Sequence, residues 1–369
     1  MAKQKDIKRN NFKNTFKIGA AALCAAAVVA MVIITGRQNA DKEEKTLNTT
    51  VMGTTASITV YGRDGSDIID GIMKLENYLD KNVISWRSDG SEVWNINHNY
   101  KAGEDYRISD ELADILGRTL DISKDNGDLL DITIRPLAEV WGIESGSTEI
   151  PDQTDIDDAL ANVDVTQVTC VSAQNGSDDQ AYVNIARGGM SLDFGAVGKG
   201  YGCDIAAKYL EEVSATGACI SLGGSIMVYG SKPDGSDWKI GVKDPRAGEG
   251  SVMGVINAKS GETLFVSTSG DYEKFFEKDG KRYHHILDPE TGYPAWKHTI
   301  AATVVCDNGL MSDALSTLCM LLDRDSAMET VSRYGAEVVL IDDQKNVYVS
   351  DGLSDRFTLS ETGYSIKYE

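Results

Sequence analysis

The apolar residues of this chain recur with two different periods, and the order of those periods limits the folds it can adopt. TTASITVYG (54–62) and TIAATVVC (299–306) have the composition of strands. IIDGIMKLENYLDKNV (68–83) has helical spacing. SDELADILGRTLDISKDNG (109–127) begins with an N-cap and an acidic first turn and stops at a glycine, as helices do. Helices and strands mix without strict βαβ alternation, which favours an α+β fold over a doubly wound sheet.

The remaining segments continue this mixed pattern. Strands are predicted at 165–171, 181–186, 218–222, 225–230, 237–243, 252–257, 263–268, 337–342 and 347–350. Helices are predicted at 154–163, 310–322 and 325–334. With 369 residues, the chain is long enough for one large domain or two moderate ones.

An uncharged stretch, IGAAALCAAAVVAMVIITG (18–36), lies near the N-terminus. As a helix it would rise about 28 Å, enough to cross the hydrocarbon core of a membrane. Lys and Arg dominate the residues before it, so the positive-inside rule places the N-terminus in the cytoplasm and the body outside. A cleaved signal peptide is the alternative. The apolar region is long for one, no A-x-A site follows it at a suitable place, and Leu23 before Cys24 fits a lipoprotein site poorly.

This reasoning predicts the organisation of the chain. We expect a cytoplasmic basic segment at 1–17, a transmembrane anchor at 18–36, a polar juxtamembrane linker at 37–50, a folded domain at 51–360 and a C-terminal tail at 361–369. The protein would then be a single-pass protein of the cell membrane with an extracytoplasmic body.

The charge of the body excludes one class of partner. The chain carries a net charge of −21, and because its first 36 residues contribute +5, the remainder carries −26. Such an acidic body repels nucleic acid and anionic membrane surfaces, so we expect no nucleic-acid partner.

The cysteines indicate neither a disulfide framework nor a zinc site. Five lie in the body, an odd number, and none forms a C-x-x-C pair. We expect most of them to be small buried apolar residues.

A glycine-rich stretch, MSLDFGAVGKGYG (190–202), resembles two phosphate-binding motifs and satisfies neither. A Walker A loop needs a glycine where this chain has Asp193, and a Ser or Thr where it has Gly200. The dinucleotide fingerprint needs a third glycine where this chain has Cys203. The motif alone is therefore weak evidence for a nucleotide site.

The physical character of this stretch still suits an anion. We expect a strand at 190–193, a turn of small residues and a helix at 201–210. Lys199 adds a positive charge, and Asp193 can accept hydrogen bonds from a base or sugar. Backbone N–H groups could approach an anion closely at three glycines: Gly195, Gly198 and Gly200. The alternative is a tight strand–helix turn in which Lys199 is only solvated.

A second group of residues lies in SDALSTLCMLL (312–322). Asp313 and Thr317 are four residues apart and therefore share one face of the predicted helix. A carboxylate and a hydroxyl so placed suit a hard cation such as Mg²⁺. A cation would also let an acidic chain hold a polyphosphate. The alternative is a helix start with an exposed Asp and a core-facing Thr.

A third stretch, STSGDYEKFFEKDGKRYHHILDPETGYP (267–294), contains two of the four histidines of the chain. His284 and His285 are followed by Asp288 and a turn. A His–Asp neighbourhood can move protons near neutral pH. The alternative is a β-hairpin whose histidines only pack.

These three stretches occur together, in this order, in the ApbE family of FAD:protein FMN transferases, which this chain resembles over roughly residues 50–360. Each matching segment is short, but nine in the family's order make a chance resemblance improbable. The segments are VMGTTASITVYG (51–62), ISWRSDGSEVWNINH (84–98), GDLLDITIRPLAEVWGI (127–143), MSLDFGAVGKGYGCDIAAKYL (190–210), CISLGGSIMVYG (219–230), WKIGVKDPR (238–246), STSGDYEKFF (267–276), YHHILDPETGYP (283–294) and MSDALSTLCMLL (311–322).

The resemblance implies an ApbE-like, two-lobed α+β fold of mixed sheets, and an activity. Members bind FAD with Mg²⁺ and transfer FMN to a Thr or Ser hydroxyl of a target protein as a phosphoester, releasing AMP. Their targets are FMN-bearing subunits of membrane redox complexes, such as the Rnf and sodium-pumping NADH:quinone reductase types. The acceptor lies in a [ST]-G-A-[ST]-like stretch, which this chain lacks, so we expect the donor enzyme.

The resemblance also implies FAD-binding residues. Met52 and Trp86 look like contacts of the flavin or adenine ring, with Trp86 where the family often has Tyr. Leu129, Leu130 and Asp131 match the family's G-x-F-D-x-T segment. Leu130 replaces the usual Phe, which places a ring-stacking role there in doubt.

Further positions belong to the same implied site. Asp193 and Lys199 resemble FAD-binding residues, and Leu287 would line the flavin. His285 matches the His of the family's H-x-x-D-P stretch and is the predicted catalytic side chain, with Asp288 expected to support its imidazole.

The implied magnesium ligands come from two segments. Asp313 and Thr317 resemble the side-chain ligands, and Ser316 would assist them. Ala196 would offer its backbone carbonyl, because the family's LDLGG is LDFGA here and the change of side chain leaves the carbonyl intact.

Two rival functions stay open at this point. An FAD pyrophosphatase would use the same metal with water as the acceptor and release FMN and AMP. A non-catalytic extracytoplasmic flavin-binding protein would carry FAD unchanged, although Asp313, Thr317 and His285 would then have no role.

Overall fold

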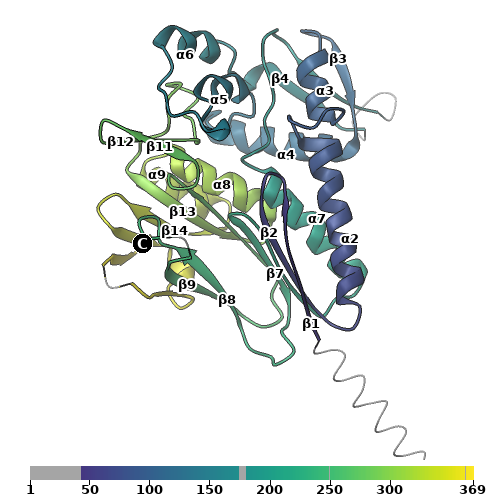
Figure 1. The fold of residues 1–369 in the computed structure, drawn as a ribbon, viewed down its shortest axis with the longest axis vertical. Coiled ribbons are helices and arrows are strands. Elements are labelled where there is room, and N and C mark those ends of the chain that lie inside the picture. Colours follow the sequence, from purple (N-terminus) through teal and green to yellow (C-terminus); the bar gives the residue numbers. More distant parts are fainter. Residues whose placement is uncertain (1–42, 174–179, 249, 362) are drawn as a thin grey trace, which may run out of the picture.

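The computed structural model describes residues 43–173, 180–248, 250–361 and 363–369 (Figure 1). Its largest element is a nine-stranded sheet in the order β1-β2-β6-β7-β10-β13-β14-β15-β17. All neighbours are antiparallel except β15 and β17, which are parallel. The strands are β1 Glu44–Val51, β2 Thr54–Tyr61, β6 Gly217–Leu222, β7 Ser225–Gly230, β10 Leu264–Gly270, β13 Thr299–Cys306, β14 Glu337–Asp342, β15 Asn346–Val349 and β17 Ser365–Tyr368.

Three smaller sheets and a set of helices surround this sheet. The small sheets are β3 Asp105–Ile108 with β5 Ala181–Ile185 and β4 Val168–Val171, β16 Phe357–Leu359 with β9 Val252–Ala258 and β8 Trp238–Lys243, and the hairpin of β11 Phe275–Lys278 and β12 Lys281–His284. The α-helices are α2 Gly65–Tyr78, α3 Glu92–Asn99, α4 Asp110–Asp125, α5 Arg135–Trp141, α6 Gln153–Leu160, α7 Gly198–Glu212, α8 Gly309–Leu321 and α9 Arg324–Arg333. Shorter helical segments are the π-helix Leu79–Ile84 and the 3₁₀ helices Ile143–Ser145, Val165–Gln167 and Asp351–Leu353.

The nine-stranded sheet separates two hydrophobic cores. In the central strand β13, Ala302 and Val304 pack in the core that contains α8, whereas Ile300 and Val305 pack in the core that contains β8 and β9. A strand buried on both faces is apolar throughout, which explains the run TIAATVVC. Figure 1 shows α3 to α6 gathered with β3 and β4 at one end of the molecule, beyond the large sheet. The predicted α+β class is confirmed.

The structure corrects the predicted linker and tail. β1 begins at Glu44, inside the stretch expected to be a linker, and β17 lies inside the expected tail. β1 pairs with β2 along its whole length through a two-residue turn, in which Met52 and Gly53 both have positive φ. β1 and β17 are the two edge strands of the sheet, and their residues are mostly polar. Their sequences therefore lack the apolar alternation that predicts a strand.

The glycine-rich stretch also differs from its prediction. No strand forms at 190–193, where Ser191 makes a single parallel bridge with Ile134. Helix α7 begins at Gly198 instead of residue 201, so Lys199 lies in its first turn. The predicted turn is therefore shorter, and two of its glycines are helical.

The predicted anchor at 18–36 and the basic segment before it lie outside the described residues. Within the described ranges, no helix combines the length and apolar character that a membrane span requires.

Candidate active site

Helices α7 and α8 meet backbone to backbone at two glycines. A Cβ added to Gly200 would lie 2.1 Å from the carbonyl oxygen of Gly309, and a Cβ added to Gly309 would lie 2.2 Å from the carbonyl oxygen of Gly200. No side chain larger than hydrogen fits at either position. Gly200 thus serves helix packing, which differs from its predicted role of exposing an N–H group to an anion. The contact brings Asp313 of α8 to the first turn of α7.

Asp313 is the centre of this contact. Its side chain is buried, and its Oδ2 accepts hydrogen bonds from the Gly200 N–H at 3.0 Å and from Lys199 Nζ at 3.3 Å. Its Oδ1 accepts a hydrogen bond from the Ser225 hydroxyl at 3.0 Å. The alternative of an exposed Asp at the start of a helix is therefore wrong. The structure brings Lys199 and Asp313 together across 114 residues of sequence.

Lys199 carries its charge inside this site. Although burial opposes ionisation, the carboxylates of Asp313 and Glu273 raise the pKa of Lys199 above its ordinary value. Its Nζ also donates to the carbonyl of Gly195 at 3.1 Å. The side chain is held by these partners, so the alternative of a freely solvated lysine is wrong.

The backbone carbonyl of Ala196 is left free by the same arrangement. In a regular helix the Gly200 N–H would donate to the carbonyl four residues earlier, which is that of Ala196. It donates to Asp313 instead, and no other donor within the described ranges reaches the Ala196 carbonyl. The unpaired Ala196 carbonyl and the buried Asp313 carboxylate, which binds the first turn of α7, are two oxygen groups that could serve as metal ligands.

Two hydroxyl groups of α8, those of Ser316 and Thr317, add to the oxygen atoms of Asp313 and Ala196. We call these four groups together the oxygen-rich site. Ser269 is the second-last residue of β10. Its hydroxyl lies 2.8 Å from that of Ser316 and 3.4 Å from that of Thr317. The Ser316 hydroxyl also donates to the carbonyl of Asp313 at 2.9 Å and is fully buried. Sequence reasoning missed Ser269. This residue lies in a segment that resembles the family, STSGDYEKFF (267–276), but its spacing from other residues is not typical of metal ligands.

These groups fit a hard cation. Carboxylate, carbonyl and hydroxyl oxygens are the ligands that Mg²⁺ takes in proteins, usually with substrate phosphates and water completing its coordination. In the part of the chain that the structure describes, no group of three or more His, Cys, Asp or Glu side chains is placed to hold a metal ion. A cation here would therefore depend on the carboxylate of Asp313 together with neutral oxygens, and the charge of Glu273 also acts on this site.

His285 follows β12 and differs from its neighbour His284. The Nδ1 atom of His285 is shielded from solvent and has no hydrogen-bond partner among the described residues. Burial lowers the pKa of His285 to about 4, and the charge of Glu144 acts in the opposite direction. The imidazole is thus neutral at pH 7 and able to accept a proton.

His284 and Asp288 have structural roles. His284 donates from Nε2 to the Ala295 carbonyl at 2.8 Å and accepts from the Ile286 N–H at Nδ1, which requires the neutral ring. Asp288 accepts from the backbone N–H groups of Glu290 and Thr291, so it holds its own turn. The expected support of the His285 imidazole by Asp288 is therefore wrong.

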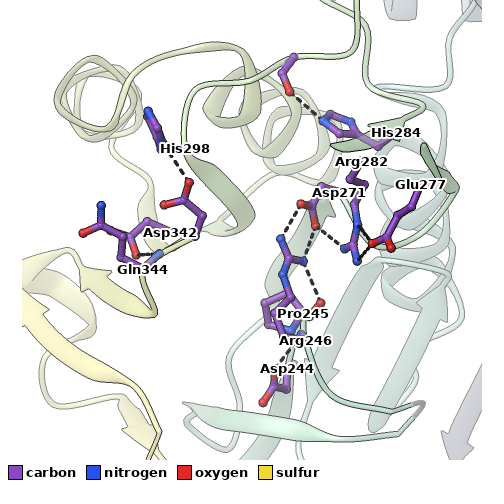
Figure 2. Close-up of polar contacts among 12 residues, drawn as sticks. Asp244, Pro245, Arg246, Asp271, Glu277, Arg282, His284, His298, Asp342 and Gln344 are labelled. Carbon is purple, nitrogen blue, oxygen red and sulfur yellow. Dashed lines mark hydrogen bonds and ion pairs between the residues drawn. The ribbon is translucent and has the colours of Figure 1, made fainter. Parts of the chain in front are cut away.

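The β11–β12 hairpin is fastened to the sheet by Asp271, directly after β10. The buried Asp271 carboxylate accepts two hydrogen bonds of 2.7 Å from Arg246 and lies 3.4 Å from Arg282 of β12 (Figure 2). Arg282 also bonds to Glu277 of β11 at 2.9 Å. Because Ser269 of the same segment contacts α8, this turn links the hairpin to the oxygen-rich site.

A half-buried carboxylate that sequence reasoning missed completes this region. Glu144, in the 3₁₀ helix Ile143–Ser145, accepts hydrogen bonds from Arg87 and Lys274, each at 2.8 Å. Burial opposes its ionisation, but the hydrogen bond from Lys274 and the charges of Lys274 and Arg87 lower the pKa of Glu144. Glu144 lies one residue beyond a recognised segment, and nothing in its local spacing singles it out.

Trp86 and Asp193 lie near this carboxylate. The guanidinium carbons of Arg87 and Arg135 are 3.7 and 3.2 Å from the centre of the Trp86 ring, which makes Trp86 a cation–π partner. Asp193 accepts the Gly195 N–H at 2.8 Å, and burial followed by the charge of Glu144 raises the pKa of Asp193. Contact of Trp86 and Asp193 with FAD stays a prediction.

The other predicted FAD contacts belong to turns and cores. The Met52 N–H donates to Asp80 Oδ2 at 3.2 Å, in the β1–β2 turn. The Asp131 carboxylate accepts hydrogen bonds within its own turn and from the Val165 N–H. Three leucines complete the set: Leu130 and Leu287 are buried in separate cores, and Leu129 packs partly buried against the first of these. Contact of these residues with FAD stays a prediction.

The fold and site together define a class of protein. A buried carboxylate, a lysine and a free carbonyl meet at a helix start, near a neutral histidine, on a mixed α+β scaffold. This combination suits a group-transfer enzyme that acts on a phosphate-bearing substrate.

Comparison with known proteins identifies the family. The model of the ApbE family matches residues 52–340, so this chain belongs to the ApbE family. The FAD:protein FMN transferase of Haemophilus influenzae is 28% identical over 352 residues, which cover 91% of this chain and 98% of that protein. The FAD:protein FMN transferase of Escherichia coli K12 is 28% identical over 294 residues, or 79% of this chain and 82% of that protein.

Solved structures show the same fold. The crystal structure of the ApbE protein from Thermotoga maritima has a TM-score of 0.71 at 28% identity and covers 87% of this chain and 98% of its own. The flavin transferase ApbE from Vibrio cholerae has a TM-score of 0.74 at 23% identity, over 85% of this chain and 99% of its own.

Proposed function

We propose that this chain is an FAD:protein FMN transferase, which moves the FMN part of FAD to a hydroxyl of a target protein and releases AMP. The observation that carries the proposal is the meeting of Asp313, Lys199 and the Ala196 carbonyl at the start of α7, in a chain of the ApbE family. Curated relatives that match this chain over most of their length bear the name of this activity.

Lys199 and the start of α7 would bind the phosphates of FAD. The Lys199 ammonium is positioned by Asp313 and Gly195, and a helix N-terminus favours negative charge. A body with a charge of −26 would repel an anionic dinucleotide, and this local positive charge would offset that repulsion.

Mg²⁺ would be held by Asp313, the Ala196 carbonyl and the Thr317 hydroxyl. Ser316 and Ser269 would position the Thr317 hydroxyl through the hydrogen bonds described above. When bound, Mg²⁺ withdraws charge from the phosphates and stabilises the charge that develops during phosphoryl transfer.

His285 would act on the acceptor hydroxyl. Its imidazole is neutral at working pH, so it can take the proton of the Thr or Ser hydroxyl as the oxygen attacks the flavin-side phosphorus. The new bond joins that oxygen to phosphorus as a phosphoester, the bridging P–O bond breaks, and AMP leaves with the bridging oxygen.

The acceptor is the one that the family resemblance implies, and the location is the one that the sequence predicts. The acceptor would be a protein with a [ST]-G-A-[ST]-like stretch, an FMN-bearing subunit of a membrane redox complex. The apolar stretch 18–36 would anchor the enzyme in the cell membrane with its catalytic domain extracytoplasmic.

One experiment tests this function against both rivals. The purified protein is incubated with FAD and Mg²⁺, with and without an acceptor domain that bears the motif. We expect the acceptor to become covalently fluorescent on a denaturing gel, with AMP released in equal amount. AMP released at the same rate without acceptor would favour the pyrophosphatase, and unaltered FAD after long incubation would favour the flavin carrier.

A further inference from the structure

We propose that Glu144 is a positioning residue for His285: it holds the segment that carries His285 and supplies the negative charge that faces its imidazole. This inference rests on the proposed function, in which His285 takes the acceptor's proton. Nothing in the family motifs quoted above includes Glu144, which follows the last residue of its recognised segment.

The geometry joins the two residues through Lys274. The Lys274 ammonium lies 2.8 Å from Glu144 Oε1, and the Lys274 carbonyl accepts a hydrogen bond of 3.0 Å from the backbone N–H of His285. Lys274 therefore makes both contacts, so the Glu144 carboxylate limits where the backbone of His285 can lie. The other carboxylate oxygen bonds to Arg87, whose guanidinium lies over Trp86.

The charges around His285 give Glu144 a second effect. The groups that face the imidazole are Glu144 from the 3₁₀ helix, His284 from β12, Lys274 from the segment before β11 and Lys199 from α7. Of these, Glu144 is the one carboxylate, and it raises the pKa of His285 while the other three lower it. Glu144 thus favours the imidazolium that forms when His285 accepts a proton.

This effect matters because the imidazole is a weak base even with Glu144 present, and would be weaker without it. Burial lowers the pKa of His285 to about 4, and its Nδ1 has no hydrogen-bond partner among the described residues. A base far below the working pH has little driving force for proton transfer. The Glu144 charge offsets part of that loss, as the carboxylate beside a catalytic histidine does in hydrolases.

A purely structural role for Glu144 is the competing explanation. An ion pair between half-exposed side chains contributes little to folding stability. The chain offers a matched control for it: Glu149 makes the same kind of bond, at 2.7 Å, with Lys278 of β11. Glu149 is 79% exposed, and among the described residues the backbone N–H of His285 bonds to Lys274 and not to Lys278.

The test is the pH dependence of FMN transfer to an acceptor domain, at saturating FAD, for the wild-type protein and three variants. We expect Glu144→Gln to move the acid limb of the profile about one pH unit lower and to reduce the plateau rate about tenfold, because the base becomes weaker. Lys274→Met should move the acid limb to higher pH, since a cation is lost. Glu149→Gln should leave limb and plateau unchanged.

The outcomes separate this inference from the function on which it rests. If the wild-type protein transfers no FMN, the proposed function itself fails. If it does transfer FMN, and Glu144→Gln shifts the profile no more than Glu149→Gln does, the positioning role is wrong. A fall in rate with no movement of the limb in either the Glu144 or the Lys274 variant would also overturn it, because that result shows a structural effect alone.

Discussion

Gly202 of α7 has no side chain, and the carboxylate of Glu76 on α2 occupies the space that a side chain would fill. A Cβ on Gly202 would lie 2.6 Å from Glu76 Oε2. Glu76 is fully buried, and neither of its oxygens has a hydrogen-bond partner among the described residues. Burial, followed by the charge of Asp80, raises the pKa of Glu76 to about 8. The two helices therefore pack around an acid that is protonated at pH 7.

This arrangement predicts a pH dependence of stability. The unfolded chain releases the Glu76 proton near pH 4.5, whereas the folded protein keeps it to about pH 8. The contribution to the free energy of unfolding is therefore complete below pH 4.5 and is lost as the pH rises to about 8, by up to about 4 kcal/mol. Glu76→Gln should flatten denaturation midpoints across this range, and Asp70→Asn, at an exposed position of the same helix, should not. Equal slopes for Glu76→Gln and wild type would contradict the prediction.

Gly200→Ala should separate α7 from α8. The new Cβ would meet the Gly309 carbonyl at 2.1 Å, and backbone atoms on both sides cannot move away cheaply. We expect a loss of roughly 3 kcal/mol in the free energy of unfolding, measured by denaturant titration. Gly117→Ala in α4, where a Cβ meets nothing within 4 Å, should instead stabilise by about 0.5–1 kcal/mol. A Gly200 variant as stable as the Gly117 variant would show that the helices do not meet as described.

Asp313→Ala should abolish transfer that depends on Mg²⁺. The variant loses the one carboxylate of the proposed metal site and leaves Lys199 without its main partner, so we expect a loss of at least about 100-fold in rate. Circular dichroism should show an unchanged fold. Wild-type flavinylation with Mg²⁺ limiting would show that the metal assignment is wrong.

The two adjacent histidines should respond in opposite ways. His285→Ala should reduce FMN transfer by about 10²–10⁴-fold and leave stability unchanged or higher, because it removes a buried nitrogen without a partner. His284→Ala should lower the free energy of unfolding by about 1–3 kcal/mol, because the Ala295 carbonyl loses its donor. Parallel measurements of transfer rate and thermal melting check both. A melting temperature that falls equally in both variants would contradict this division of roles.

Asp271→Ala should destabilise the protein strongly. The variant leaves two guanidinium groups, those of Arg246 and Arg282, without their shared buried carboxylate, and breaking such a pair costs about 3–5 kcal/mol. Asp343→Ala removes the partner of the exposed His298, at 2.9 Å, and should cost less than about 1 kcal/mol. Urea denaturation of both variants gives the comparison, and similar midpoints would refute the proposed role of the Asp271 network.

Long elements with strong periodicity were predictable from the sequence. The prediction of strand 299–306 agrees with β13, and the helix expected at 109–127 agrees with α4, including the Ser109 N-cap that accepts the Leu112 N–H. In both cases the local pattern and the tertiary burial demand the same structure. The edge strands β1 and β17 were not predictable, because half-exposed strands need not alternate.

The candidate site also has a part that the sequence predicted and a part that it did not. Sequence patterns selected Asp313, Lys199 and His285, because their residue types suit a metal, an anion and a proton. The family resemblance added the backbone carbonyl of Ala196. They did not show that Gly200 is a helix contact, that Asp288 serves its own turn, or that the charge of Glu144 acts on His285. These are relations between segments that lie far apart along the chain.

The sequence by itself determined the α+β class, most of the buried elements and the chemical groups available for catalysis, because these follow from the order and type of neighbouring residues. Only the tertiary structure decided which groups meet and how they are charged. The distance between Lys199 and Asp313 depends on the packing of α7 against α8, and the neutral state of His285 depends on burial, which the charge of Glu144 opposes. Such contacts arise from the folding of distant segments, which no local pattern encodes.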